Sequence, residues 1–338
     1  MDILKEPHIR KNILTGDEVL VSPHRTKRPW QGKVEDQFVP VSLEYDPNCY
    51  LCPGNTRASR DVNPNYEDTF VFTNDYAALK EDTEAADYVS GLLEAKAERG
   101  ICRVVCFSPN HSLTLSKMEI PAIEKVITTW QREFAELSTL DFINNVQIFE
   151  NRGDIMGCSN PHPHGQIWAQ KSIPTELQKK THNFAKYHAS NQSKTLLEAY
   201  LTQEIQEKER IVYANEHFAV LVPFWAVWPF EAMIVPKKAM KNILEMTPEE
   251  ITSYADAIKT ITSVYDKVFN VPFPYSAGIH QAPTNNQSND GWHWHMSFYP
   301  PLLRSATVKK FMVGYEMFAM PQRDITAEKA AEMLRDLV

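Results

Sequence analysis

The order of predicted elements repeats once along this chain, and this repeat constrains the possible folds more than any other feature. A strand, a second strand, a helix, a third strand and a strand with a His-x-His motif follow one another over residues 69–170 and again over residues 210–300. Both copies open on an apolar run broken by Asn and an acidic residue, at Asn74-Asp75 and Asn215-Glu216. Such self-similarity is the signature of a repeated structural unit. We therefore expect one fold to occur twice.

The helix of each copy is predicted by its first residues and by the spacing of its apolar side chains. The first helix begins near Pro121, and apolar residues follow at helical intervals up to Phe134. In the second helix Thr247 is the N-cap, Pro248 takes the first helical position and Glu250 completes a capping box. We predict strands at residues 103–107, 146–149 and 162–168, at 231–235, 275–280 and 293–299, and a short terminal helix capped by Thr326.

The composition excludes several classes of protein. The formal net charge is -8, whereas a general nucleic-acid binder or a binder of acidic membranes needs an excess of Lys and Arg. Residues 1–10 lack the apolar core of a signal peptide, and no run reaches the roughly 18 apolar residues of a membrane helix. Five cysteines are too few for a disulfide framework. We expect a soluble, cytoplasmic protein.

The run Asn-Pro-His-Pro-His-Gly-Gln at residues 160–166 is the candidate for chemistry. A neutral imidazole is available at pH 7, so His164 can attack a phosphate and form a P–N bond that is reactive enough to pass a nucleotidyl group onward. Gln166 shares a strand face with His164 and is placed to donate to a phosphoryl oxygen. The alternative is a pair of histidines that only pack on a sheet, and the flanking Gly-Cys-Ser-Asn-Pro argues against it.

Cys49 and Cys52 form a short-spaced thiolate pair, which is the usual half-site for tetrahedral zinc. The best candidates to complete a Cys2His2 site are His111, in the turn after a predicted strand, and His162. Such a closed site would be structural, because it has no open position for water. The alternative is a reduced cysteine pair in a turn. The other cysteines, Cys102, Cys106 and Cys158, are predicted to be buried thiols.

Residues 157–169 resemble the active-site signature of the galactose-1-phosphate uridylyltransferase family, which belongs to the histidine-triad superfamily. The resemblance covers almost the whole chain, with further matching blocks at residues 21–30, 49–55, 72–75, 149–151 and 300–316. It implies an α+β fold in which a histidine-triad-like unit is duplicated, with a mostly antiparallel sheet (half-barrel) and flanking helices. We expect halves at residues 1–170 and 210–338, joined by a linker at 171–209.

The resemblance also implies a reaction. UMP would pass from UDP-glucose to His164 and glucose 1-phosphate would leave; galactose 1-phosphate would then take the uridylyl group and become UDP-galactose. The family further implies a homodimer and a structural zinc on the four residues named above. By position, Arg25 and Arg28 would meet phosphates across the dimer interface, Asn74 and Asp75 the uridine, Asn151, Gly157, Ser159 and Gln166 the phosphoryl groups, and Lys310, Phe311, Tyr315, Glu316 and Gln322 the sugar phosphate.

The sequence departs from the family's pattern at one place. Family members often carry a second metal on a glutamate and three histidines, and only His280 and His295 match. Ser297 stands at the third histidine position and Lys180 at the glutamate position. His293 or His182 are the available substitutes, but a cation in place of an acid ligand argues against metal binding. We predict that the second metal is absent or weakly bound.

Two other functions stay open at this point. A related enzyme, such as an ADP-sugar or dinucleoside-polyphosphate phosphorylase, would use the same nucleophile with adenine, but would leave the C-terminal hexose-binding block unexplained. A non-catalytic, zinc-stapled nucleotide-binding module would keep the pocket without needing His164 as a nucleophile.

Overall fold

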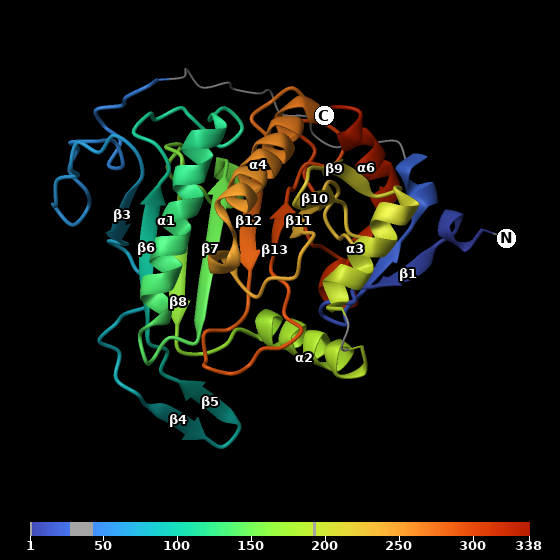
Figure 1. Cartoon of the computed structure of the whole chain (residues 1–338), viewed down its shortest axis with the longest axis horizontal. Coiled ribbons are helices and arrows are strands. Elements are labelled where there is room, and N and C mark those ends of the chain that lie inside the picture. The colour runs from blue at the N-terminus through green and yellow to red at the C-terminus, as the bar shows by residue number, and fades with distance from the viewer. Residues whose placement is uncertain (1, 28–42, 192–193) are drawn as a thin grey trace.

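A single nine-stranded sheet forms the centre of the structure, which is a computed structural model describing residues 2–27, 43–191 and 194–338 (Figure 1). Every neighbouring pair in this sheet is antiparallel, and the sheet stays open. Its strands, in spatial order, are β3 (Phe70–Thr73), β6 (Gly100–Cys106), β8 (His164–Gln170), β7 (Asn145–Arg152), β12 (Tyr275–His280), β13 (His295–Tyr299), β11 (Ala232–Pro236), β10 (Phe218–Leu221) and β9 (Ile211–Ala214).

The strand order confirms the duplication. The first four strands of the sheet come from the N-terminal copy and the other five from the C-terminal copy, and corresponding strands stand in mirrored order on either side of the seam between β7 and β12. That seam pairs residues 148–152 with residues 275–279 in one regular antiparallel ladder. The two copies therefore share one continuous sheet (Figure 1).

Two long helices cover one face of this sheet, α1 (Ile120–Ser138) and α4 (Pro248–Val268). The predicted capping box is present at α4, where Thr247 accepts from the Glu250 backbone and Glu250 accepts from the Thr247 backbone. The buried sides of both helices pack on the same core as the inward residues of the strands. The short helix α6 (Ala327–Arg335), capped by Thr326 as predicted, closes this core at the C-terminal edge.

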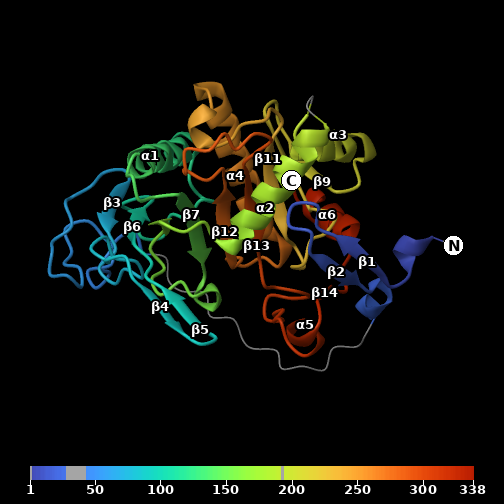
Figure 2. The ribbon, with the colours of Figure 1, turned by 90° about the horizontal axis from the view of Figure 1, so that it is seen from below.

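The opposite face of the sheet is only half covered in its middle. In β8, β7 and β12 buried residues alternate with half-buried ones, and the half-buried set lies on this second face. Helices α2 (Thr175–Ser190) and α3 (Leu196–Glu207) cover the C-terminal strands there, and the segment around Leu51 covers β6. In the view from below, α1 and α4 lie above the sheet, and β4, β5, β14 and α5 lie below it (Figure 2). The half-buried residues of the second face are at positions 164, 166 and 168, at 147, 149 and 151, and at 276, 278 and 280.

The smaller elements carried no strong sequence signal. They are a three-stranded sheet of β1 (His8–Lys11), β2 (Glu18–Val21) and β14 (Gln322–Arg323), an exposed hairpin of β4 (Asp87–Ser90) and β5 (Leu93–Lys96), the short helix α5 (Tyr315–Phe318), and the 3-10 helices η1 (Ile3–Lys5), η2 (Pro23–Lys27), η3 (Asp154–Met156) and η4 (Ile243–Glu245). Among the described residues, none of the helices combines the length and the apolar character needed to cross a bilayer.

One predicted boundary is wrong in a way that matters for the site. The histidine strand was expected to begin at His162, but β8 begins at His164. The backbone of His162 leaves the ladder because Pro161 and Pro163 fix φ and carry no donor. The second histidine strand shows the same shift and begins at His295 instead of His293.

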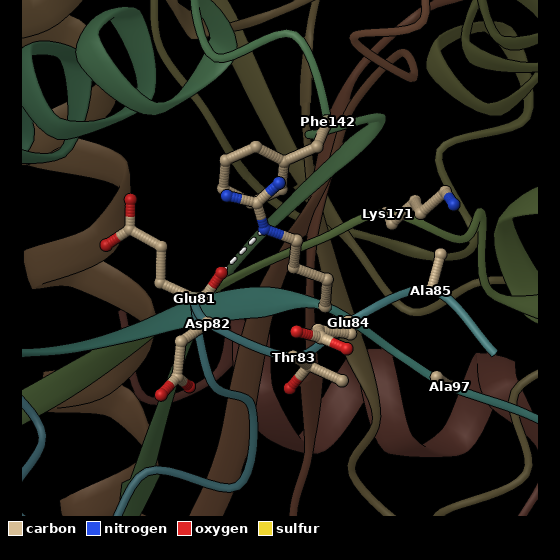
Figure 3. A pocket seen from close by; sticks show the side chains of 9 residues that line it. Glu81, Asp82, Thr83, Glu84, Ala85, Ala97, Phe142 and Lys171 are labelled. Atoms are coloured by element: carbon tan, nitrogen blue, oxygen red, sulfur yellow. Dashed lines mark hydrogen bonds between the residues drawn. The ribbon is translucent and has the colours of Figure 1, made fainter.

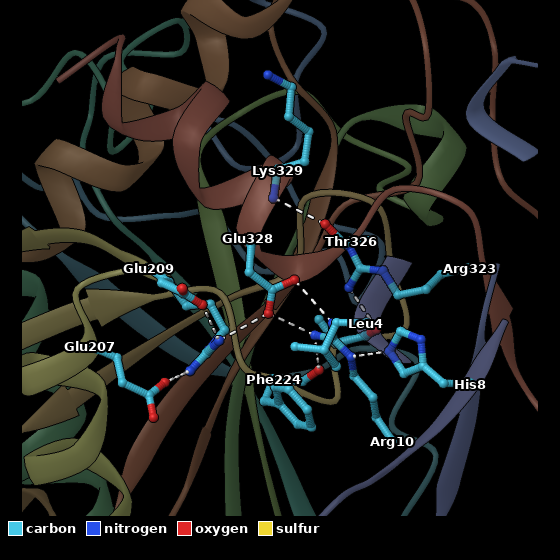
Figure 4. Close-up of polar contacts among 12 residues, drawn as sticks. Leu4, His8, Arg10, Glu207, Glu209, Phe224, Arg323, Thr326, Glu328 and Lys329 are labelled. Atoms are coloured by element: carbon cyan, nitrogen blue, oxygen red, sulfur yellow. Dashed lines mark hydrogen bonds and ion pairs between the residues drawn. The ribbon is translucent and has the colours of Figure 1, made fainter. Parts of the chain in front are cut away.

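A buried polar cluster joins the two ends of the chain to the segment that connects the copies (Figure 4). Glu328 of α6 accepts two hydrogen bonds from Arg10, at 2.9 and 3.0 Å, and one from Arg210 at 2.9 Å. Arg210 also binds the fully buried Glu204 of α3. Because Arg10 is only 1% exposed, its charge depends on Glu328 for neutralisation inside the protein.

We expect Glu328→Gln to lower the free energy of unfolding by about 3 kcal/mol at pH 7, because it leaves two buried guanidinium groups short of one negative charge. Burial alone would raise the pKa of Glu328, but the hydrogen bonds and charge of Arg10 lower that pKa from 4.5 to about 2. The stabilisation is therefore complete above pH 4.5 and is lost as the pH falls toward 2.

Urea denaturation of the wild type and this variant from pH 7 down to pH 2 measures the effect. The difference between the two curves should shrink as the pH falls. Glu332→Gln, in the exposed pair with Lys329, is the matched control and should change little. An equal loss in both variants would contradict the prediction.

Candidate active site and metal centre

His164 stands at the first position of β8, on the half-covered face of the sheet. Its Nδ1 lies 2.7 Å from the carbonyl oxygen of His162. A carbonyl can only accept, so Nδ1 carries the proton and Nε2 keeps its lone pair. Burial lowers the pKa of His164, and the bond to the carbonyl offsets only part of this shift. The imidazole is therefore neutral at pH 7 with a free nucleophilic nitrogen.

The residue after His164 is a glycine because two groups approach its backbone closely. A Cβ at Gly165 would meet the Phe107 ring and the Phe149 carbonyl oxygen, each at 2.9 Å. Both contacts belong to the tightly packed side of the strand, so a side chain there would push β8 out of the ladder. Gly165 thus lets β8 pair closely with β6 and β7, which keeps His164 in its place in the sheet.

The structure brings the four predicted metal ligands together. One ligand atom from each of Cys49, Cys52, His111 and His162 lies within 4.8 Å of every other. The Cys52 Sγ is 3.5 Å from the Nδ1 of His111 and 3.5 Å from the Nδ1 of His162. Tetrahedral zinc with S and N ligands would separate these atoms by about 3.6 Å, so the donor set fits such an ion.

A further shell of hydrogen bonds fixes the orientation of these ligands. The Nε2 of His162 donates to the Ser108 carbonyl at 2.8 Å, which leaves Nδ1 as the atom that faces the ligand group. Asn160 accepts from the His162 backbone N–H at 2.9 Å and donates to the Cys49 sulfur at 3.3 Å. The Tyr66 hydroxyl lies 3.1 Å from the His162 ring.

Neither Asn160 nor Tyr66 was predicted from the sequence. Asn160 lies inside the run at residues 160–166, and this position could have indicated that it contributes to the site. Tyr66 lies far from any motif and had none. Through these contacts His162 serves two purposes: its ring belongs to the ligand group, and its carbonyl oxygen sets the tautomer of His164.

The predicted phosphoryl contacts come from two segments beside His164. Gln166 lies two residues further along β8 on the same face, and Asn151 lies on the same face of the neighbouring strand β7. Gly157 and Ser159 follow η3 and are exposed. The backbone at Gly157 has a φ of 78°, a conformation that favours glycine, and its left-handed turn ends η3.

The predicted uridine contacts lie at the end of the edge strand β3. Asn74 is joined to β6 by its backbone N–H, which donates to the Cys102 carbonyl at 2.9 Å. The Asp75 carboxylate is 3.7 Å from Arg57 and accepts from the Ser59 backbone at 3.3 Å. Asp75 is therefore fixed at the rim of the sheet by a half-buried arginine.

The predicted sugar-phosphate contacts gather elsewhere, around the three-stranded sheet of β1, β2 and β14. Lys310 binds Glu316 and the Gln322 carbonyl, both at 2.6 Å. Arg25 and the Gln322 side chain both bind one carboxylate, that of Asp324, at 3.1 and 2.7 Å. We term this the tail cluster: Arg25, Lys310, Glu316, Gln322 and Asp324. Phe311 and Tyr315 extend from it, 60% and 52% exposed, and Arg28 lies outside the described residues.

The second copy contains a closely similar pair of histidines, His293 and His295, but a lysine side chain lies against the second of them. The Nε2 of His293 donates to the Pro236 carbonyl at 2.8 Å, and Nδ1 of His295 is 3.3 Å from the His293 carbonyl. The Nε2 of His295, which corresponds to the Nε2 of His164, lies 3.2 Å from the buried Lys180 ammonium. The His280 and His295 rings stack at 4.9 Å. Burial lowers the pKa of Lys180 to about 8.

A hollow of about 340 Å³ lies at the other end of β8, more than about 15 Å from His164 along the strand (Figure 3). Arg99 crosses it, with its guanidinium 3.7 Å from the centre of the Phe142 ring and its Nε donating to the Glu81 carbonyl. The hollow is lined by residues 81–85, Ala97, Arg99, Phe142 and Lys171. It includes none of the predicted site residues.

Comparison with known families gives matches along the whole chain. The model described as galactose-1-phosphate uridyl transferase, N-terminal domain, matches residues 1–174, and that of the C-terminal domain matches residues 180–338. The chain is 48% identical over 334 residues to the galactose-1-phosphate uridylyltransferase of Haemophilus influenzae, covering 98% of this chain and 95% of that one. With the enzyme of Saccharomyces cerevisiae it shares 45% over 352 residues, covering 99% and 96%.

Solved structures give the same fold. A structure described as a uridylyltransferase superposes with a TM-score of 0.77 at 26% identity, covering 97% of both chains. An ADP-glucose phosphorylase from Arabidopsis thaliana with bound ADP-glucose superposes with a TM-score of 0.76 at 23% identity, covering 98% of this chain and 99% of that one. At that identity the second likeness concerns the fold alone.

Proposed function

Because the chain belongs to the galactose-1-phosphate uridylyltransferase family, a family of nucleotidyltransferases, we propose that it exchanges UMP between UDP-glucose and galactose 1-phosphate through His164. The observation that carries this proposal is the hydrogen bond between His164 Nδ1 and the His162 carbonyl, which leaves Nε2 unprotonated. Full-length identity of 45 to 48% to enzymes with this name supports the choice of substrates.

In the first half-reaction the Nε2 lone pair attacks the α-phosphorus of UDP-glucose. A P–N bond forms, and the bond from that phosphorus to the bridging oxygen breaks, so that glucose 1-phosphate leaves with the electron pair. The imidazole gains positive charge as it is uridylylated, and its Nδ1–H remains bonded to the His162 carbonyl, which stabilises that charge. In the second half-reaction a phosphate oxygen of galactose 1-phosphate displaces His164 and gives UDP-galactose.

We propose zinc as the ion held by Cys49, Cys52, His111 and His162. When bound, the ion supplies a rigid fourfold attachment and leaves no position for a water molecule. It would connect the segment around Cys49 to the turn before β8, and through the His162 carbonyl this attachment would hold the nucleophile. The Lys180 ammonium beside His295 and the hydroxyl side chain at Ser297 favour a single metal per chain.

We also propose that the protein acts as a homodimer. The tail cluster belongs to the three-stranded sheet, whereas His164 belongs to the nine-stranded sheet. A second copy would bring its tail cluster to the half-covered face, so that Arg25 and Lys310 of one subunit meet the phosphates bound by the other. Large apolar side chains near this cluster support an interface, because they are 52 to 90% exposed in the single chain: Phe311, Val313, Tyr315, Met317 and Phe318.

The division into halves at residues 1–170 and 210–338 with a linker at 171–209 gives each half a role: the first holds the nucleophile and metal, the second the tail. A location in the cytoplasm agrees with five free cysteines and with nucleotide-sugar substrates.

A donor test separates this function from the alternatives. Mixed with UDP-glucose and no acceptor, the enzyme should release one glucose 1-phosphate per chain and gain the mass of a uridylyl group. ADP-glucose should give neither, because the proposed enzyme selects uridine. Release from ADP-glucose alone would instead support an ADP-sugar phosphorylase, and binding without any release or mass gain would indicate a non-catalytic nucleotide-binding protein.

A further inference from the structure

Two side-chain amides flank His164 on the half-covered face, one on its own strand and one on the next. Gln166 is two residues along β8, and the ladder between β7 and β8 pairs Gln166 with Phe149. Extending this register by two residues sets Asn151 across from His164 on the same face. The nucleophile therefore stands between two groups that can each present either an oxygen or an NH2 group.

A neighbouring donor occupies the oxygen of each amide. The Trp168 indole N–H donates to Gln166 Oε1 at 3.0 Å. The Ser276 hydroxyl donates to Asn151 Oδ1 at 2.7 Å, across the seam between β7 and β12, where these two residues are direct partners. Among the described residues, neither amide nitrogen has a hydrogen-bond acceptor. Neither nitrogen is fully buried.

The direction of an amide decides whether it attracts or repels a phosphoryl group. An amide oxygen facing phosphoryl oxygens would oppose them, whereas an NH2 group donates to them. An indole N–H can only donate, so Trp168 accepts no arrangement of Gln166 except oxygen toward the ring. The Ser276 hydroxyl can donate or accept; here it donates to Asn151 Oδ1, and this hydrogen bond holds the Asn151 oxygen toward β12.

We infer that Trp168 and Ser276 are positioning residues that hold the NH2 groups of Gln166 and Asn151 toward the phosphoryl group attacked by His164. This inference rests on the proposed function. The phosphoryl oxygens gain negative charge as the nucleophile approaches, and donors already fixed in direction stabilise that charge without first reorienting. Ser276 belongs to the second copy, so the second half supplies part of the orientation of a site whose nucleophile belongs to the first.

The test uses the full chain. UDP-glucose with galactose 1-phosphate gives kcat and KM, and UDP-glucose alone gives the single-turnover rate of adduct formation. We expect Trp168→Phe and Ser276→Ala each to lower kcat and the single-turnover rate about fivefold to tenfold, the value of one oriented hydrogen bond, with KM nearly unchanged. Ser276→Thr keeps the hydroxyl and should restore most of the rate. Ser263→Ala removes a comparable hydroxyl, bonded to the Ser116 carbonyl on the opposite face, and should have no effect.

Double variants distinguish positioning from packing. In a Gln166→Ala background, Trp168→Phe should cause no further loss, and Ser276→Ala should cause none in an Asn151→Ala background, because the amide it orients is gone. Equal losses with and without the amide would overturn the inference, as would wild-type rates in both single variants. Failure of the wild-type enzyme to form any uridylyl adduct would instead remove the proposed function on which the inference rests.

Discussion

His164→Gly is expected to abolish uridylyl transfer, with turnover at least about a thousandfold below the wild type. The substitution removes the Nε2 lone pair that His164 holds at the start of β8. The His162 ring cannot replace it, because its two nitrogens are engaged with the ligand group and with the Ser108 carbonyl. Intact-mass measurement after mixing with UDP-glucose is the direct readout. The uridylyl adduct seen with the wild type should be missing in the variant.

The matched control for this substitution is His182→Ala, which removes an exposed histidine from α2. It should keep both the adduct and the rate. An adduct of unchanged size in His164→Gly would mean that a different residue is attacked, and peptide mapping of the modified chain would then identify it.

Cys52→Ala is expected to cause the second large effect, a fall in bound zinc from one equivalent per chain to nearly none. Cys52 is fully buried, and its sulfur lies 3.5 Å from the Nδ1 of both His111 and His162. Without the ion, the turn that carries His162 loses its anchor, and the His162 carbonyl no longer holds His164 in one tautomer. We therefore expect adduct formation to slow by about 10- to 100-fold.

Elemental analysis of the purified protein and single-turnover adduct formation measure these two effects together. Cys102→Ala is the matched control: it removes a fully buried thiol of β6 that is not part of the ligand group, and should leave zinc at one equivalent. Full zinc content in Cys52→Ala would contradict the assignment of ligands. Two equivalents in the wild type would contradict the prediction for the second copy.

The fold could be predicted largely because the elements of each copy are specified by residues close together in the sequence. The capping box at Thr247 and the apolar spacing of α1 depend on residues within a few positions, and both predictions are confirmed. The four residues predicted to bind a metal also come together, because the Cys-x-x-Cys spacing and the position of His111 after β6 limited the choices. The exposed hairpin of β4 and β5 has no buried side to create a pattern, so it left no comparable signal.

What could not be predicted depends on pairing between distant strands. The contact between Ser276 and Asn151 requires the register of β7 against β12, which no local pattern specifies. The turn at His162 follows from prolines that the sequence displays, yet its direction depends on Ser108 and Asn160. The roles of Gln166 and Asn151 are predictions that the variants above test, and the role of the tail cluster is a prediction that a forced monomer would test.

The seam between β7 and β12 has a consequence for how the enzyme moves. Five consecutive residue pairs join the two copies through backbone hydrogen bonds, and the strands on both sides are buried against α1 and α4. Rotation of one half against the other would break this ladder, so the two halves cannot open and close as jaws around a ligand. Entry of one sugar phosphate and departure of the other must therefore take place by movement of surface segments and side chains, while the sheet beneath them stays rigid.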